Sequence, residues 1–226
     1  MQTTTVTPNV TQLTRLRFVN AFLVREEDGF TLVDTTTSGG ADALIGAARS
    51  SGGEIRRIAL THGHGDHVGS LDALMERLGS TAQVLMPELD ARIHSGEKVV
   101  DGKPPGQWPS IKTTPHVRLV AGDRVGSLEV VASPGHTPGH VSFLDTRDRT
   151  LIAGDVYTTY GRTAVTNHFY WRFPLAAMGT WDKAKDLESA TRLRGLDPTT
   201  LVVGHGPVVR GPGSAMDRAL AEGRIA

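Results

Sequence analysis

The residues with the clearest chemical potential lie in one nonapeptide, Thr61-His62-Gly63-His64-Gly65-Asp66-His67-Val68-Gly69. Three imidazoles and one carboxylate fall within six residues, and glycines separate them. Neutral imidazole nitrogens and carboxylate oxygens are ligands of zinc and related cations. Glycine lets the backbone turn tightly enough to aim several ligands at one point. The run therefore indicates the first half of a metal site.

The sequence around this run predicts where it sits in the fold. Residues 55–60 read as a strand. Leu71, Leu74, Met75 and Leu78 follow the i, i+3, i+4, i+7 spacing of a helix that Gly79 would end. The ligands are therefore expected on a strand-to-helix loop at the end of a sheet, a frequent position for functional residues.

Three more polar residues follow predicted strands and have glycine close by. They are His136 after 128–132, Asp155 after 150–153 and His205 after 201–203. Each loop is of the kind that presents one ligand.

The other elements complete a mixed α and β pattern. Further strands are expected over 15–18, 21–24, 30–33, 82–86, 117–120 and 141–144. Helices are expected over 41–49, 87–94 and 182–195, with a final helix capped by Ser214. Residues 95–117 lack periodicity and predict a long surface loop beside the site, and residues 158–181 form a second irregular, aromatic stretch. In this order of elements, helices can cover the outer faces of two packed sheets.

Composition narrows the classes of protein. The 226 residues suit a single domain spanning 1–226. Lys+Arg and Asp+Glu are both 24, and this balance argues against a nucleic-acid binder. The chain has no cysteine, so a metal must be held by nitrogen and oxygen. No apolar run is long enough to cross a membrane, and residues 1–12 lack the features of a signal peptide, so we expect a cytoplasmic protein.

Taken together, the motifs resemble those of the metallo-β-lactamase superfamily over nearly the whole chain. The matching pieces are Val33-Asp34-Thr35, the His-x-His-x-Asp-His run, Pro134-Gly135-His136-Thr137, Gly154-Asp155 and Gly204-His205-Gly206. The resemblance implies an α/β (α+β) fold, the αββα sandwich of two mixed β-sheets flanked by helices. It also implies a two-metal site at the edge of the sheets.

Carried over to this chain, the resemblance implies a ligand set. The first metal would take His62, His64 and His136, the second would take Asp66, His67 and His205, and Asp155 would bridge them with a water or hydroxide. Zinc is the first expectation, and manganese, iron and cobalt accept the same ligands. Two such cations can share and acidify one water that attacks an acyl carbon, with Asp66 as proton shuttle.

Several other residues receive more modest roles. We expect His140 and Asp34 to support the ligands rather than bind metal, and His94 and His116 to be exposed. Tyr157 and His168 are candidate substrate-binding residues. In lactonases of the superfamily a tyrosine usually comes three residues after the bridging aspartate. Here that position holds Thr158, and Tyr157 comes two residues after.

These features favour a dinuclear hydrolase that cleaves a carboxylic ester, lactone or thioester of a small molecule. Asp155 argues against a β-lactamase-type amide hydrolase, which remains an alternative. A mononuclear iron persulfide dioxygenase of the same fold is another, and a non-catalytic binding module is a third, although this chain keeps every ligand. A small-molecule substrate is the expected partner, and a homodimer is compatible with the aromatic stretch.

Overall fold

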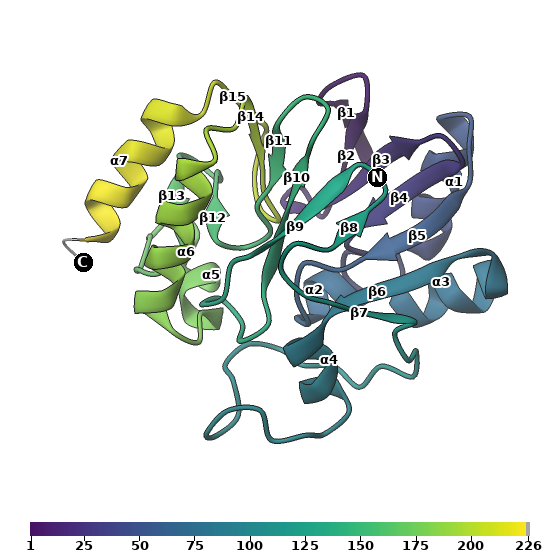
Figure 1. Ribbon diagram of the computed structural model, residues 1–226, viewed down its shortest axis with the longest axis horizontal. Coiled ribbons are helices and arrows are strands. Elements are labelled where there is room, and N and C mark those ends of the chain that lie inside the picture. The colour runs from purple at the N-terminus through teal and green to yellow at the C-terminus, as the bar shows by residue number, and fades with distance from the viewer. Residues whose placement is uncertain (225–226) are drawn as a thin grey trace.

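Two large β-sheets pack face to face, and helices cover their outer faces (Figure 1). The computed structural model describes residues 1–224. Across that range the first sheet has the order β1-β2-β3-β4-β5-β6-β7. Its strands are β1 (Gln2–Thr5), β2 (Val10–Arg15), β3 (Val19–Glu26), β4 (Gly29–Val33), β5 (Ile55–Ala59), β6 (Gln83–Pro87) and β7 (Val117–Leu119). β1 to β4 pair in antiparallel fashion, whereas β4 to β7 are parallel.

The second sheet has the order β15-β14-β11-β10-β9-β8. Its strands are β8 (Arg124–Val125), β9 (Leu128–Ala132), β10 (Val141–Asp145), β11 (Thr150–Ile152), β14 (Thr200–Val202) and β15 (Val209–Arg210). A small ribbon pairs β12 (Tyr157–Thr158) with β13 (Ala164–Val165). The helices are α1 (Ala41–Ser50), α2 (Gly65–Val68), α3 (Leu71–Leu78), α4 (Glu88–His94), α5 (Pro174–Gly179), α6 (Lys183–Gly195) and α7 (Gly213–Gly223), with a 3-10 turn at Gly79–Thr81.

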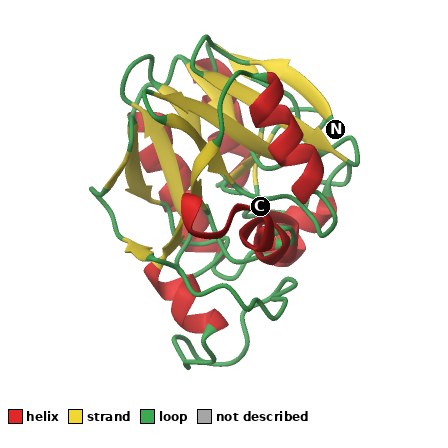
Figure 2. Cartoon of the chain, turned by 90° about the vertical axis from the view of Figure 1, so that its right-hand side faces the viewer, coloured by secondary structure: helices red, strands yellow, loops and turns green. Residues whose placement is uncertain are grey.

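Central strands alternate their side chains between two apolar layers, which explains the sandwich. On β3, Phe22 faces the layer between the sheets, and Leu23 faces the layer under α1 and α3. On β14, Val202 faces the layer between the sheets, and Leu201 packs against α6 and α7. Because successive side chains of a strand point to opposite faces, both faces of each sheet are buried. The result is the αββα arrangement predicted from the sequence, with the strands inside and the helices outside (Figure 2).

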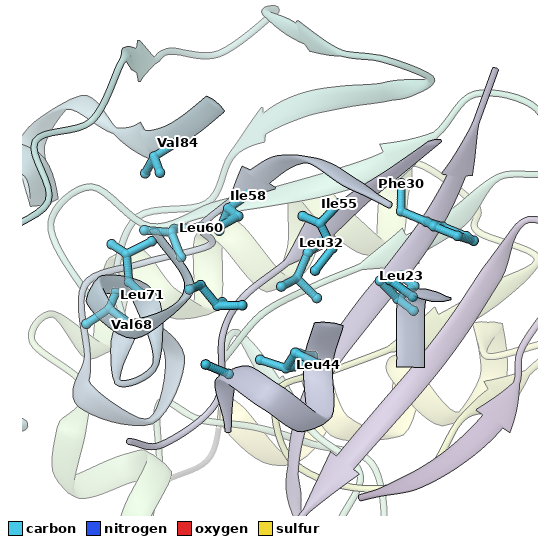
Figure 3. Packing of buried hydrophobic residues seen from close by; sticks show 14 of the residues in the cluster. Leu23, Phe30, Leu32, Leu44, Ile55, Ile58, Leu60, Val68, Leu71 and Val84 are labelled. Carbon is cyan, nitrogen blue, oxygen red and sulfur yellow. The ribbon is translucent and has the colours of Figure 1, made fainter. Parts of the chain in front are cut away.

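The layer under α1 and α3 anchors the strand that carries the first ligands. Leu32 and Ile58 from the first sheet meet Leu44 of α1 and Leu71 of α3 in this layer (Figure 3). These side chains are fully buried, and a buried leucine or isoleucine contributes about 1.5–3 kcal/mol relative to an exposed one. The packing therefore fixes the end of β5, where the metal-binding run begins.

Two details of the sequence prediction were wrong. The strand expected over 15–18 ends at Arg15, because Leu16 and Arg17 adopt left-handed conformations (φ 51° and 70°) and turn the chain into β3. Ser214 does not cap α7, which begins one residue earlier. Asp182 does cap α6, since its side chain accepts the Lys185 N–H at 3.0 Å. Among the described residues, no helix has the length and apolar character needed to cross a membrane.

Candidate metal centre

Parallel strands bring the candidate ligands to one edge of the sandwich. His62 follows β5 in the first sheet, and His136, Asp155 and His205 follow β9, β11 and β14 in the second. β9 and β11 are both antiparallel to β10, and β11 is parallel to β14, so these three strands end on the same side. Residues after the carboxyl ends of such strands meet in space, which is why ligands far apart in sequence converge.

The one-turn helix α2 places the remaining ligands. His64 is extended (ψ 152°) just before it, and Asp66 and His67 lie within it. The short helix thus presents His64, Asp66 and His67 over the strand ends.

The structure brings all seven predicted ligands together. Three groups have ligand atoms within 4.8 Å of one another: His62, His64 and His136; His62, His67 and Asp155; and Asp66, His67 and His205. The first and third groups coincide with the two ligand sets that the resemblance implied.

Asp155 lies between these two sets. Its Oδ1 is 3.4 Å from His67 Nε2, and its Oδ2 is 3.5 Å from His136 Nε2 and 3.1 Å from His205 Nε2. Gly204 makes room for this carboxylate, because a Cβ at that position would overlap Asp155 Oδ1. The position is the one that a bridging ligand requires.

Hydrogen bonds orient two histidines through one buried aspartate. Asp34 Oδ2 accepts the Nδ1–H of His67 at 2.8 Å and the hydroxyl of Thr61 at 2.8 Å. Since the Thr61 hydroxyl donates to Asp34, its oxygen accepts from His62 Nδ1 at 3.0 Å. With Nδ1 engaged in both histidines, Nε2 is the nitrogen that faces the cluster and is left for a metal. The prediction that Asp34 supports the ligands is confirmed.

Distant segments orient two more histidines in the same way. His136 Nδ1 lies 3.1 Å from the hydroxyl of Thr180, which itself donates to main-chain carbonyls. His205 Nδ1 lies 3.1 Å from the carbonyl oxygen of Phe18. In each case the proton sits on Nδ1, and Nε2 faces Asp155.

The loop predicted over 95–117, the flap, fixes the last histidine. His64 Nε2 donates to the carbonyl of Pro105 at 3.1 Å, so Nδ1 is the nitrogen left for a metal, and it lies 3.1 Å from His136 Nε2. Gly106 has φ +86°, and a Cβ there would overlap His64 Nε2. Gln107 also accepts a hydrogen bond from the Gly65 N–H at 2.9 Å. Residues 95–116 thus form a loop that contacts the site, as predicted.

The polar atoms left without partners fit a bound metal. Within residues 1–224, His62 Nε2, His67 Nε2 and Asp155 Oδ1 are buried and make no hydrogen bond. Burying such atoms unsatisfied costs about 1–3 kcal/mol each, and more for a charged group. Divalent cations would satisfy all three, so the donor set suits metal.

The electrostatics favour the ligand form of His62, His136 and Asp155. Burial alone would lower the pKa of His67 and His205, but the neighbouring carboxylates raise both, to about 9 for His205, so a cation has to displace a proton from each of these two. Burial lowers the pKa of His62 and of His136 well below the ordinary value, so both imidazoles are neutral. Burial alone would raise the pKa of Asp155, but His205 and His67 together lower it well below its usual range. Neutral imidazole and ionised carboxylate are the forms that bind metal.

His140 supports the site and does not join it. Its Nδ1 lies 2.9 Å from the Ser133 hydroxyl, and its Nε2 accepts the Asp155 N–H at 3.0 Å. Burial lowers its pKa to about 3. With both nitrogens engaged, His140 has the supporting role predicted for it.

Asp90 is a supporting residue that the sequence did not reveal. Its carboxylate accepts the N–H of Gly63 at 2.8 Å, the N–H of Gly139 at 2.7 Å and the hydroxyl of Thr137 at 2.7 Å. Burial raises its pKa to about 6. Asp90 thus connects the loop that carries His62 and His64 to the loop that carries His136. The sequence around Asp90 predicts only a short helix and gives no sign of this role.

A cavity of about 470 Å³ opens onto the cluster. Five of the seven candidate ligands line it, and Gly106 and Gln107 border it from the flap. Its apolar lining comes from Phe18, Phe173, Leu175, Ala176 and Met178. Most of these residues lie in the stretch 158–181. That stretch was predicted to be irregular, but the structure places β13 and α5 within it.

The structure corrects both substrate-binding candidates. Tyr157 is fully buried, and its hydroxyl donates to the Ala190 carbonyl of α6 at 2.7 Å, so it does not reach the cavity. His168 pairs with the Asn167 side chain at 2.9 Å and lines a separate surface depression. His116 is exposed as predicted, whereas His94 is half-buried and lies 2.9 Å from the Gly63 carbonyl.

The amino-acid sequence is similar to that of several known proteins. Residues 14–205 match the family model of the metallo-beta-lactamase superfamily. YobT, an uncharacterized protein of Bacillus subtilis, is 40% identical over 91% of each chain. The probable metallo-hydrolase YflN of the same organism is 30% identical over 86% of this chain and 81% of its own length. A hydroxyacylglutathione hydrolase of a Synechococcus strain is 30% identical over 81% of this chain but only 65% of its own length.

Solved structures agree on the fold. The metallo-beta-lactamase from Pontibacter korlensis has a TM-score of 0.75 and 19% identity, covering 100% of this chain and 99% of its own. A protein crystallised in a di-iron-bound form has a TM-score of 0.68 and 27% identity, covering 90% of this chain and 95% of its own.

Proposed function

Because this chain belongs to the metallo-beta-lactamase superfamily of metal-dependent hydrolases, we propose that it is a dinuclear enzyme that hydrolyses a carboxylic ester, lactone or thioester. Water adds to the acyl carbon, the acyl–oxygen or acyl–sulfur bond breaks, and a carboxylic acid and an alcohol or thiol are formed. The observation that carries the proposal is the position of Asp155 between two complete ligand groups.

The residues divide between two cation positions. His62, His64 and His136 would hold one cation, Asp66, His67 and His205 would hold the other, and Asp155 would contact both. Two bound cations supply an acidified water and polarise a substrate oxygen. The relative crystallised with two iron ions and the donor set here support a pair of divalent metals, with zinc as the first choice.

The chain's own groups keep this site ordered and handle protons. The partners of the histidine ring nitrogens fix each imidazole in its ligand tautomer. Asp66 is the most accessible ligand, with a 36% exposed side chain that lines the cavity. Burial alone would raise its pKa, but His67 and His205 lower it below the ordinary value. A carboxylate in this place can pass a proton from water to the leaving group.

Metal content and activity together test the proposal. Protein loaded with zinc, manganese or iron is expected to hold about two ions per chain and to cleave members of an ester, lactone and thioester panel. His67→Ala and Asp155→Ala should each abolish turnover while circular dichroism stays unchanged. His168→Ala is the matched control, since this histidine lies outside the cavity lining.

The alternatives give distinct results in the same experiment. About one iron per chain with oxygen consumption on a persulfide would replace the proposal by the dioxygenase hypothesis. Cleavage of β-lactams alone would replace it by the amide hydrolase. Full activity of His67→Ala with one metal lost would refute the two-metal mechanism.

A further inference from the structure

The cavity beside the cluster has an unusual charge pattern. Within the described residues, no lysine or arginine lines it, and its charged side chains are the ligands Asp66 and Asp155. Away from the cation positions, a carboxylate or phosphate on a substrate would find no side-chain cation in this lining, and an unpaired charge is costly to bury. The lining therefore suits a substrate whose acyl chain, where it extends away from the cations, carries no anionic group.

The helix α5 offers an apolar surface next to the reaction centre. Leu175 and Met178 are 61% and 68% exposed and line the cavity, although Ala176 and Ala177 of the same helix are buried. Exposed apolar side chains that converge on a cavity point to a ligand that covers them.

α5 also lies close enough to the metal ligands to guide a chain bound there. A Cβ at Gly179, its last residue, would be 3.4 Å from His136 Cε1 and 3.6 Å from His64 Cε1. Phe173, just before α5, packs its ring against His205 with the centroids 4.8 Å apart. An acyl group whose carbonyl carbon sits at the cluster can thus extend along α5 between these contacts.

We propose that this cavity binds the acyl part of an uncharged ester, lactone or thioester, with an apolar chain of several carbons lying along Leu175 and Met178. The inference rests on the proposed hydrolase function and adds the class of substrate. It disfavours acyl donors that carry a carboxylate at the far end of the acyl chain.

A series of p-nitrophenyl esters from acetate to octanoate tests the inference on metal-loaded enzyme. Burying one methylene contributes about 0.8 kcal/mol, so kcat/KM should rise by up to about fourfold for each carbon that enters the cavity. A carboxylate at the far end of an otherwise equal chain should abolish that gain. Equal rates at all lengths, or a preference for the carboxylate, would overturn the inference.

Substitutions on α5 test whether this helix causes the dependence on chain length. The double variant Leu175→Ser, Met178→Ser should flatten the dependence on chain length and should raise KM more for octanoate than for acetate. Phe169→Ser is the matched control, because Phe169 is 67% exposed on the same stretch but does not line the cavity. A wild-type dependence in the double variant, or a flattened one in the control, would refute the assignment to α5.

Binding of uncharged methyl ketones of the same lengths, measured by calorimetry, separates this inference from the proposed function. If no ester is hydrolysed but ketone affinity rises with chain length, the hydrolase proposal fails and the apolar subsite stands. If affinity is independent of length, the subsite fails.

Discussion

Replacing Asp34 by asparagine removes one negative charge beneath the metal centre and keeps the shape of the side chain. Asp34 accepts hydrogen bonds from His67 Nδ1, the Thr61 hydroxyl and the Thr61 N–H, all at 2.8 Å. The carbonyl oxygen of asparagine can serve the Thr61 N–H. Its amino group then faces His67 and donates to Nδ1, so the His67 proton moves to Nε2.

A protonated Nε2 cannot bind a cation, and this sets the size of the effect. Losing a partner that orients a ligand histidine typically reduces metal affinity about 10–100-fold, or about 1.4–2.7 kcal/mol. We expect the upper end, because the Thr61 hydroxyl also loses its acceptor and relays the change to His62. Backbone strain stays constant, since Asp34 has φ 61° and asparagine tolerates this region as well as aspartate does.

Competition with a chelator of known affinity measures the loss, with circular dichroism to show that the fold remains. Asp145→Asn is the matched control, because Asp145, the last residue of β10, is equally buried but pairs with Arg147 in the turn that follows. That variant should lose stability and keep its metals. Unchanged metal affinity in Asp34→Asn would refute the idea that this carboxylate sets the tautomer of His67.

Three further predictions concern the flap and the core. Gly106→Ala should weaken metal binding, because a Cβ there overlaps the ligand His64. Gly102→Ala, with a similar φ of +74° and open space around it, is the control and should leave metal affinity unchanged. Equal metal affinities of the two variants in chelator competition would refute this prediction. The pKa of Asp72 is lowered because donors from Thr113 and its neighbour outweigh the effect of burial. Its stabilisation of the flap should therefore be complete above the unfolded-state pKa of about 4 and be lost as the pH falls through the lower folded-state value. Hydrogen-exchange protection of the flap amides should show this loss, and Asp72→Asn should remove it. Tyr157→Phe should cost about 0.5–1.5 kcal/mol in urea unfolding and leave kcat/KM unchanged; a large drop in kcat/KM would restore its role in substrate binding.

The candidate ligands could be predicted because their signals are local. They stand in glycine-rich segments that follow predicted strands, and parallel strands place such segments at one edge. The helices around β5 were also predictable, since their apolar spacing matches the layer that buries them.

Tyr157 could not be placed from the sequence for a stereochemical reason. β12 has two residues, and neighbouring residues of a strand point to opposite sides. Tyr157 points toward α6, whereas the hydroxyl of Thr158 donates to the His205 carbonyl beside the cluster. A tyrosine at position 158 would face the site, whereas at position 157 it faces the core.

The partners that orient the histidines lie beyond sequence reasoning because they are defined only by the closed sandwich. The Phe18 carbonyl comes from the turn before β3 in the first sheet, and it fixes His205 at the end of β14 in the second. Asn20, at the start of β3, also donates to the carbonyls of Val203 and Gly206 at 2.8 Å. Packing of the two sheets therefore creates the correct tautomer of His205. Since each proposed cation position would take ligands that follow strands of both sheets, a bound metal would hold the sheets together, and folding and metal binding would be coupled.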